Sequence, residues 1–237
     1  MPISQYIIVP VFLVLAAYLT VKVQKLTVAG AVAGAIIGFL VFAGSRLTGL
    51  SMLAAFFILG TIATSWKKAD KQRFKSESDK SVKRSASQVL ANGGVAAILG
   101  LLAILLPGYA SEFRIMMAAA LASATADTLS SELGMIYGRR FFNILTFKKE
   151  QKGLDGVISI EGLLIGIIGS AIIAAIYPGG YIGASVLWMI VICGTMGNLA
   201  DSVLGATLER KGLIGNNLVN FLNTLIAALI MLTFLTL

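Results

Sequence analysis

The sequence contains no histidine and a single cysteine, Cys193. The absence of histidine excludes catalysis by an imidazole acid or base, Ser–His catalytic pairs and zinc sites with His ligands. One cysteine forms no disulfide within the chain and supplies no Cys-rich metal site. The side chains that remain for chemistry are carboxylates, amides, hydroxyls and the positively charged groups of Lys and Arg.

Charged residues are also scarce: they make up 13% of the 237 residues, whereas 57% are hydrophobic. Soluble domains carry about 25% charged and 45–50% apolar residues, so the composition indicates an integral membrane protein. The formal net charge of +8 would point to nucleic acid in a soluble protein. Here the basic residues lie between apolar runs, so we expect cytoplasmic loops and no nucleic-acid partner.

Apolar runs of bilayer-spanning length recur along the chain. A bilayer core of about 30 Å needs roughly 20 apolar residues per helix. The first run has no basic residues before it, so we expect a retained helix rather than a signal peptide. The predicted fold is all-α: a polytopic bundle in one transmembrane domain, residues 1–237, with about eight spans. These spans are 4–21, 28–44, 49–66, 87–106, 114–134, 158–177, 182–206 and 216–236.

The basic residues predict the orientation. With the N-terminus outside, all but two of the 19 Lys and Arg residues fall in inner loops, and the exceptions are Arg46 and Arg114. This asymmetry follows the positive-inside rule and predicts that both termini lie outside. In a prokaryote the membrane is the plasma membrane, and the inner side is the cytoplasm.

Two of the predicted inner loops are long, a basic loop at 67–86 and a second loop at 138–157. We expect residues 67–80 to be mainly solvated. In the second loop, "FFNILTF" is flanked by basic residues. Such a segment is typical of the membrane interface, where Lys and Arg meet anionic headgroups.

Small residues mark the second span, where Gly30, Gly34 and Gly38 share one helix face. This spacing lets helix backbones approach closely. We expect packing within the monomer or between subunits, so a homo-oligomer stays open.

Polar side chains recur on single faces of four spans, at helical intervals. They are Arg84, Gln88 and Asn92 at the fourth span, Ser123, Asp127 and Ser131 in the fifth, Asn198 and Asp201 in the seventh, and Asn216, Asn220 and Asn223 in the eighth. The fifth and seventh spans run inward and the other two run outward, so all four sets fall near the inner end. We predict one polar cavity that opens to the cytoplasm.

Carboxylic acids inside a span are costly, by about 2.5–3.5 kcal/mol at mid-bilayer, and are functional by default. Asp127, Glu132 and Asp201 with Asn198 supply hard oxygen ligands, which suit Mg²⁺. Lys83 and Arg84 lie at the same level and suit phosphate. Together these groups are typical of phosphoryl or nucleotidyl transfer, although the sequence has neither a Walker A motif nor a G-x-G-x-x-G motif.

A structural role is the alternative for several of these residues. Asn and Ser side chains form hydrogen bonds between membrane helices, worth about 0.6 kcal/mol each. Glu132 lies nearer the interface than Asp127, and Asp155 in "KGLDGVIS" also fits an ordinary Asp-Gly turn.

Five stretches resemble the motifs of one membrane protein family, in the same order. They are "QVLANGG", "ATADTLSSELG", "KGLDGVISIEG", "GNLADSVLGATLE" and "NNLVNFLNT". Through them the chain resembles, over roughly residues 30–237, the domain-of-unknown-function-92 family, which contains the plant phytyl-phosphate kinase. The motif acids fall on Asp127, Glu132, Asp155 and Asp201, and the motif amides on Asn92, Asn217 and Asn220.

The resemblance implies a kinase that transfers a phosphoryl group from a nucleoside triphosphate, CTP before others, to phytyl or geranylgeranyl phosphate. The chain is also distantly similar to polyprenol kinase and phosphatidate cytidylyltransferase, which use CTP and Mg²⁺. On this interpretation Asp127 and Asp201 hold Mg²⁺ with Glu132 and Asn198, and Arg84 neutralises charge during transfer. Further contacts to nucleotide or lipid phosphate are expected from Lys83, Gln88, Asn92, Lys152, Asp155, Asn217 and Asn220.

A second hypothesis is a transporter of ions or small anions through a Gly-rich helical bundle. Transporter sites usually lie near the bilayer midplane. The acids here fall toward one end of their spans, which favours the enzyme.

Overall fold

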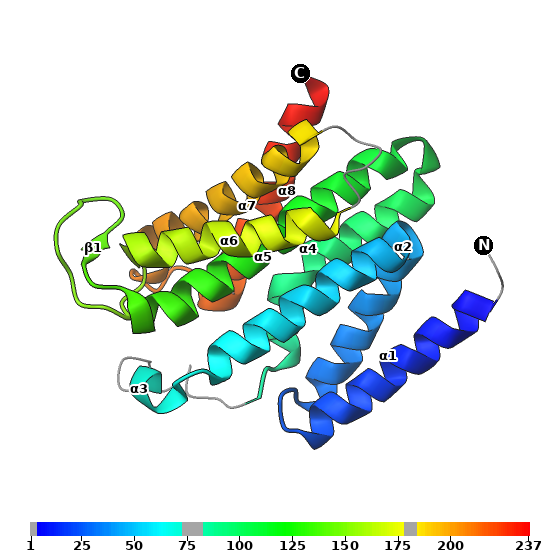
Figure 1. Cartoon of the computed structure of the whole chain (residues 1–237), viewed down its shortest axis with the longest axis horizontal. Coiled ribbons are helices and arrows are strands. Elements are labelled where there is room, and N and C mark those ends of the chain that lie inside the picture. Colours follow the sequence, from blue (N-terminus) through cyan, green and yellow to red (C-terminus); the bar gives the residue numbers. More distant parts are fainter. Residues whose placement is uncertain (1–3, 73–82, 178–183) are drawn as a thin grey trace.

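Long apolar helices make up most of the computed structural model, which describes residues 4–72, 83–177 and 184–237 (Figure 1). The long helices are α1 (Ser4–Lys22), α2 (Val28–Ser65), α4 (Ala86–Leu105), α5 (Ala110–Tyr137), α6 (Ile160–Ile176), α7 (Ala184–Leu204) and α8 (Asn216–Thr236). The short elements are α3 (Lys68–Gln72), the 3₁₀ turn η2 (Pro107–Tyr109), the π-helical turn η3 (Gly205–Glu209) and the strands β1 (Phe141–Asn143) and β2 (Val157–Ser159).

Four helical segments of the described chain are long and apolar enough to cross a membrane. They are Val28–Ser65, Ala86–Leu105, Ser185–Glu209 and Asn216–Thr236. Two shorter apolar helices, Ile7–Lys22 and Ile160–Ile176, accompany them. The all-helical membrane character predicted from composition is therefore confirmed.

Helix α2 contains both the second and the third predicted span. Arg46 in its middle has φ 61° and ψ −153°, which is not helical, and the ribbon folds back there into two limbs (Figure 1). Arg114 of α5 donates from Nε to the carbonyl oxygen of Gly44 at 2.8 Å. A carbonyl at the end of the first limb, which has lost its helical partner, is thereby satisfied.

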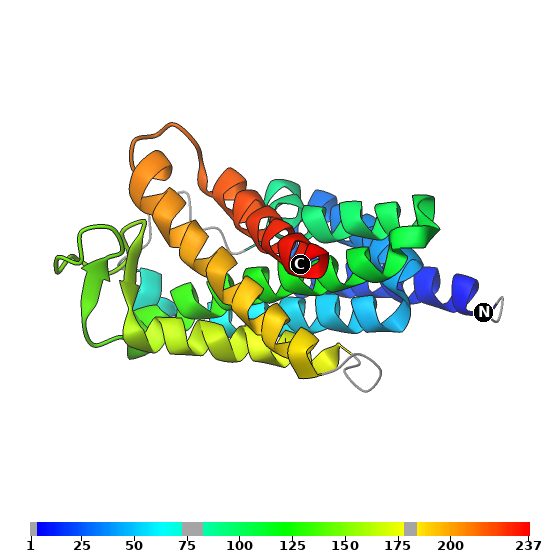
Figure 2. The same cartoon turned by 90° about the horizontal axis from the view of Figure 1, so that it is seen from above.

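Helix α5 lies at the centre of the bundle and contacts α2, α4, α6, α7 and α8. Its run from Met116 to Ala126 is buried throughout. Alanine dominates this run, and small side chains let neighbouring helices approach closely. The central position of α5 explains why its polar residues at the next turns can meet side chains from several helices. Helix α1, by contrast, lies at the edge of the bundle beside α2 (Figures 1 and 2).

The segment between α5 and α6 departs from the all-α prediction, because it forms a small antiparallel hairpin at one end of the bundle (Figure 2). Phe141 pairs with Ser159, and Asn143 pairs with Val157. The Ser159 side chain then accepts a hydrogen bond from Gly162 N and so begins α6. Local β pairing inside a loop leaves no long periodic signal in a sequence, which is why the spans were predicted and the hairpin was not.

The basic loop at 67–86 is not wholly solvated, which corrects the prediction for its first residues. Residues 68–72 form α3, and the Lys71 side chain is buried, with 1% of its surface exposed. Residues 73–82 of this loop lie outside the described residues. Lys71 points inward because its ammonium group donates to three acceptors there, two backbone carbonyl oxygens and the carboxylate of Glu132.

Candidate functional site

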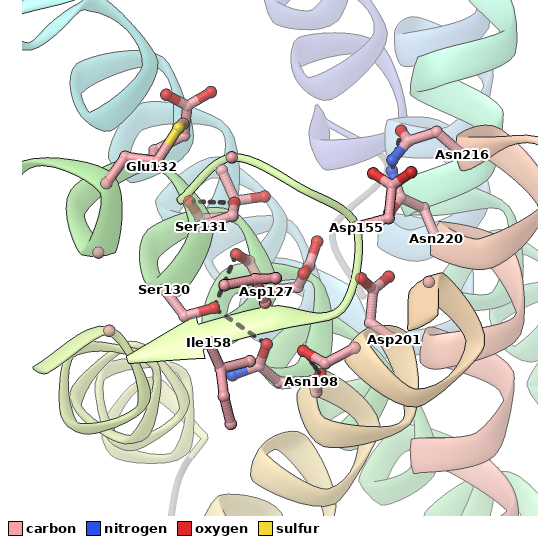
Figure 3. Close-up of a pocket in the computed structure, with 18 of the residues that line it drawn as sticks. Asp127, Ser130, Ser131, Glu132, Asp155, Ile158, Asn198, Asp201, Asn216 and Asn220 are labelled. Atoms are coloured by element: carbon pink, nitrogen blue, oxygen red, sulfur yellow. Dashed lines mark hydrogen bonds between the residues drawn. The ribbon is translucent and has the colours of Figure 1, made fainter. Parts of the chain in front are cut away.

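A cavity of about 500 Å³ opens at the end of the bundle that carries the hairpin (Figure 3). All four predicted polar faces contribute to it, through Gln88 and Asn92 of α4, Asp127 of α5, Asp201 of α7 and Asn220 of α8. Residues 153–159, which lead into β2, close another side. The prediction that these faces share one cavity is confirmed.

Two carboxylates from different helices meet in this cavity. Asp127 of α5 and Asp201 of α7 point into the same space and interact with each other (Figure 3). Asn223 of α8 donates from Nδ2 to Asp201 Oδ1 at 2.7 Å, and Ser123 of α5 donates to Asn223 Oδ1 at 3.1 Å. These hydrogen bonds fix the position of the Asp201 side chain, so residues of α5, α7 and α8 together hold the acid pair in place.

Beside the acid pair, Asn198 lies one turn before Asp201 on α7. The Ser130 hydroxyl is 3.0 Å from Asn198 Oδ1 and 3.0 Å from the carbonyl oxygen of Asp127. On the other side, a Cβ on Gly166 of α6 would lie 2.8 Å from Asn198 Nδ2. The amide is therefore oriented by its neighbours, and its oxygen has a hydrogen-bond partner.

Glu132 lies apart from the acid pair and has its own cationic partner. Lys71 donates from Nζ to Glu132 Oε2 at 2.5 Å and to the carbonyl oxygens of Ala63 and Thr64 at 2.7 and 3.1 Å. An ammonium group has three donors, and all three are used here. The structure thus places Glu132 in a buried ion pair, and its predicted metal contact stays a prediction.

Arg84 lies just before α4 and contributes a cation to the cavity wall, which Lys25, Lys68 and Lys71 also line. Its guanidinium sits over the Phe56 ring, 6.0 Å from the ring centre. Burial lowers the pKa of Arg84, and the nearby charge of Glu132 opposes that shift. Because an Arg pKa normally lies above 12, the group remains a cation that is poorly solvated and suited to bind an anion.

The other predicted contacts divide into two groups. Gln88, Asn92, Asp155 and Asn220 line the cavity. Lys83, Lys152 and Asn217 are not among its lining residues, and Asn217 is exposed. Its neighbour Asn216 lines the cavity instead and accepts a hydrogen bond from Asn220 at 3.2 Å. The phosphate contacts predicted for Lys83, Lys152 and Asn217 stay predictions.

The Asp155 backbone is held by the segment after η3. Arg210 donates from Nε to the Asp155 carbonyl oxygen at 2.6 Å and pairs with Glu150 at 2.7 Å. The hydrogen bond from Arg210 lowers the pKa of Glu150, so this pair is charged at neutral pH. The loop that carries Asp155 is thereby tied to the segment after η3.

Lys71 and Ser130 line the cavity although the sequence does not predict them as parts of the site. Ser130 lay off the face that joins Ser123, Asp127 and Ser131, and nothing in the sequence around Lys71 distinguishes it from its solvated neighbours. The polar face predicted for the eighth span includes Asn223, and in the structure Asn223 is the direct hydrogen-bond partner of Asp201.

The donor set can be tested against the metal that the acids imply. The described residues hold no group of three or more His, Cys, Asp and Glu side chains placed to bind a metal ion. Mg²⁺ usually takes one or two carboxylates and completes its shell with water and substrate phosphates. The Asp127–Asp201 pair fits that pattern, whereas it does not fit a closed site made of protein ligands alone.

The helices and the cavity define a class, namely multi-pass helical membrane proteins with a polar site of acids, amides and cations at one end of the bundle. Within that class the chain belongs to the family described as Integral membrane protein DUF92, which matches residues 11–228. The family resemblance seen in the five motifs is confirmed.

Relatives from an archaeon and a plant match most of the chain. The uncharacterized membrane protein MJ0933 of Methanocaldococcus jannaschii is 35% identical over 210 residues, covering 85% of this chain and 82% of its own length. Protein VTE6, chloroplastic, of Arabidopsis thaliana is 26% identical, covering 88% of this chain and 65% of the relative. Protein PGR of the same plant is 28% identical, covering 84% and 77%. No solved structure matches the chain.

Proposed function

We propose that this protein is an isoprenyl phosphate kinase. It transfers the γ-phosphoryl group of a nucleoside triphosphate, with CTP as the first candidate, to phytyl or geranylgeranyl phosphate. The products are the isoprenyl diphosphate and the nucleoside diphosphate. The observation that carries the proposal is the Asp127–Asp201 pair, which faces the same cavity as the Arg84 cation. Membership of a family that contains a plant phytyl-phosphate kinase, and the match to a chloroplast relative, support it.

The proposal includes an orientation in the membrane. The two limbs of α2 with α1, α4, α5, α6, α7 and α8 would supply eight spans, with both termini outside. The cavity then lies at the cytoplasmic end, because basic residues gather at that end under the positive-inside rule. A nucleotide reaches such a site from the cytoplasm, while a lipid phosphate reaches it from the bilayer.

The carboxylates and the amides have different roles at the reacting phosphates: the carboxylates would bind the metal, and the amides would contact phosphate oxygens. Asp127 and Asp201 would hold Mg²⁺, which supplies neutralisation of phosphate charge when it is bound. Asn223 keeps the Asp201 carboxylate in position through its 2.7 Å hydrogen bond. Gln88, Asn92 and Asn220 offer amides to phosphate oxygens from the opposite helices.

Arg84 is the cation placed to neutralise negative charge on the lipid phosphate and in the transition state. In the transfer step an oxygen of the lipid phosphate forms a bond to the γ-phosphorus, and the bond from that phosphorus to the oxygen of the departing nucleoside diphosphate breaks. The attacking oxygen is already ionised at neutral pH, so no general base is needed. The lack of histidine is therefore compatible with the reaction.

A reconstitution experiment tests the proposal. The purified protein in phospholipid nanodiscs is given Mg²⁺, geranylgeranyl phosphate and CTP, ATP or GTP, and the lipid products are identified by mass spectrometry. Formation of the diphosphate with any of the donors supports the kinase. If no donor is consumed, and sealed proteoliposomes instead accumulate labelled phosphate, the protein is a transporter and the proposal is wrong.

A further inference from the structure

A second cavity, of about 300 Å³, lies between α1, the two limbs of α2 and the beginning of α4. We call it the apolar groove, and define it by Phe12 and Ala16 of α1, Gly34 and Phe57 of α2, and Val89 of α4. Its walls are hydrophobic along most of their length. Only at one end do polar residues join the lining, and these are Thr20, Arg84, Gln88 and Asn92.

The groove and the polar cavity share part of one wall. Arg84, Gln88 and Asn92 line both. The Arg84 guanidinium lies over the ring of Phe56, which itself lines the groove. The Arg84 cation therefore lies where the apolar groove meets the polar cavity. This arrangement suits an amphiphile with an anionic head and a hydrocarbon tail.

Small side chains keep the groove open. Ala16, Ala17, Ala31, Gly34, Ala35 and Gly38 all line it. At Gly34 an added Cβ would meet only Val89 Cγ1 at 3.9 Å and Leu26 Cδ1 at 4.0 Å, so there is room for a side chain that the sequence leaves unfilled. Helix α1 packs against α2 at the bundle's edge (Figure 1), so the groove lies beside the surrounding lipid.

We propose that the apolar groove binds the isoprenyl chain of the lipid phosphate, with the phosphate at Arg84 and the chain between α1, α2 and α4. This inference rests on the proposed kinase function and adds to it the path of the chain. Lipid tails are as apolar as the groove walls, so leaving the bilayer for the groove brings little hydrophobic gain. The groove therefore acts by shape: it places the phosphate and selects for chain length.

A pair of variants on one helix tests the chain path by turnover. Gly34→Phe puts a ring into the groove, whereas Val32→Phe adds the same ring on α2 at a residue that is exposed and outside the groove lining. We expect Gly34→Phe to lower kcat/KM for geranylgeranyl phosphate by roughly tenfold or more, as misfits in hydrophobic pockets do. Turnover of the short dimethylallyl phosphate should stay as in the wild type, and Val32→Phe should change neither. Equal losses for both substrates, or no loss for the long one, would overturn the proposal.

A binding experiment keeps the groove testable apart from catalysis. Wild-type protein in nanodiscs is photolabelled with geranylgeranyl phosphate that carries a diazirine on its last isoprene unit. We expect labels on groove residues of α1 and α2, which excess geranylgeranyl phosphate removes and excess phosphatidylglycerol does not. Labels elsewhere would overturn the proposed chain path, and groove labels that phosphatidylglycerol displaces would assign the groove to ordinary bilayer lipid. Groove labelling without turnover would refute the kinase function but support chain binding in the groove. Turnover with labels elsewhere would support the kinase function but refute chain binding in the groove.

Discussion

At the scale of single residues, the pair of Asp127 and Asp201 carries the largest electrostatic cost of the site. Two carboxylates side by side in a membrane protein repel each other, and each has also lost much of its hydration. A cation or a proton between them relieves the repulsion. Asn223, Ser123 and Ser130 hold the surrounding groups in place, which is how a binding site differs from an accidental meeting of acids.

The acid pair makes the first prediction. Asp127→Asn and Asp201→Asn should each lower kcat by roughly 100-fold or more, since even the outer partners of a metal ligand contribute 10–100-fold. Both should also raise the Mg²⁺ concentration needed for half-maximal turnover. Asp70→Asn is the matched control, because Asp70 is an exposed acid on α3 outside the cavity lining. Full activity in Asp127→Asn would remove Asp127 from the metal site.

The buried pair of Lys71 and Glu132 makes the second prediction. Removing one partner breaks the ion pair while the other charge stays buried, so Lys71→Met and Glu132→Leu should each lower the free energy of unfolding, by up to about 3–5 kcal/mol. The loss should be smaller in Lys71→Met, because Arg84 lies near enough to Glu132 to interact with its charge. The double variant should regain most of that loss, because a well-packed apolar pair replaces the charges. Thermal unfolding in detergent measures all three. If the single-variant losses simply add in the double variant, the two residues do not act as a pair.

At the scale of elements, the loop before β2 depends on one glycine. Gly156 has φ +70°, and an added Cβ would lie 2.5 Å from Ala206 N and 2.6 Å from Ser202 O. This close approach seats the loop against α7 and η3 and brings Asp155 to the cavity.

Gly156→Ala should therefore destabilise the protein and lower turnover. Gly212→Ala is its matched control, because Gly212 has a similar φ of +68° and nothing within 4 Å of an added Cβ. Both variants carry the left-handed backbone cost of about 1–2 kcal/mol, and only Gly156→Ala adds the clash. Thermal unfolding and the kinase assay should separate the two variants, and equal behaviour would show that the contact with α7 is unimportant.

The helices of this protein were predictable from sequence, and their local exceptions were not. Spans such as 216–236 coincide with α8 because roughly 20 apolar residues leave few alternatives in a bilayer. The hairpin at 141–159 pairs two short strands within one loop and leaves no long periodic signal. The inward turn of Lys71 depends on acceptors from α2 and α5, which come together only in the packed bundle. For the same reason, helical spacing placed Asn223 on the polar face, but the structure was needed to reveal its bond to Asp201.

At the scale of the whole molecule, the proposed orientation puts η2 outside and the segment after η3 inside. Single cysteines at Gly108 and Lys211, both exposed positions, test it, and the native Cys193 is buried. In intact cells a membrane-impermeant maleimide should label Gly108→Cys, and it should label Lys211→Cys only after permeabilisation. The reverse pattern would place the polar cavity on the outer face, away from cytoplasmic nucleotide.

The central claim is that the cavity transfers a phosphoryl group to a lipid phosphate. The most direct measurement gives the purified protein CTP radiolabelled in its γ-phosphate together with geranylgeranyl phosphate and Mg²⁺, and follows the label into the lipid fraction. The account predicts labelled geranylgeranyl diphosphate from the wild type and almost none from Asp201→Asn. The claim is contradicted if the label stays with the nucleotide or appears as free phosphate, and if γ-labelled ATP and GTP also give no labelled lipid.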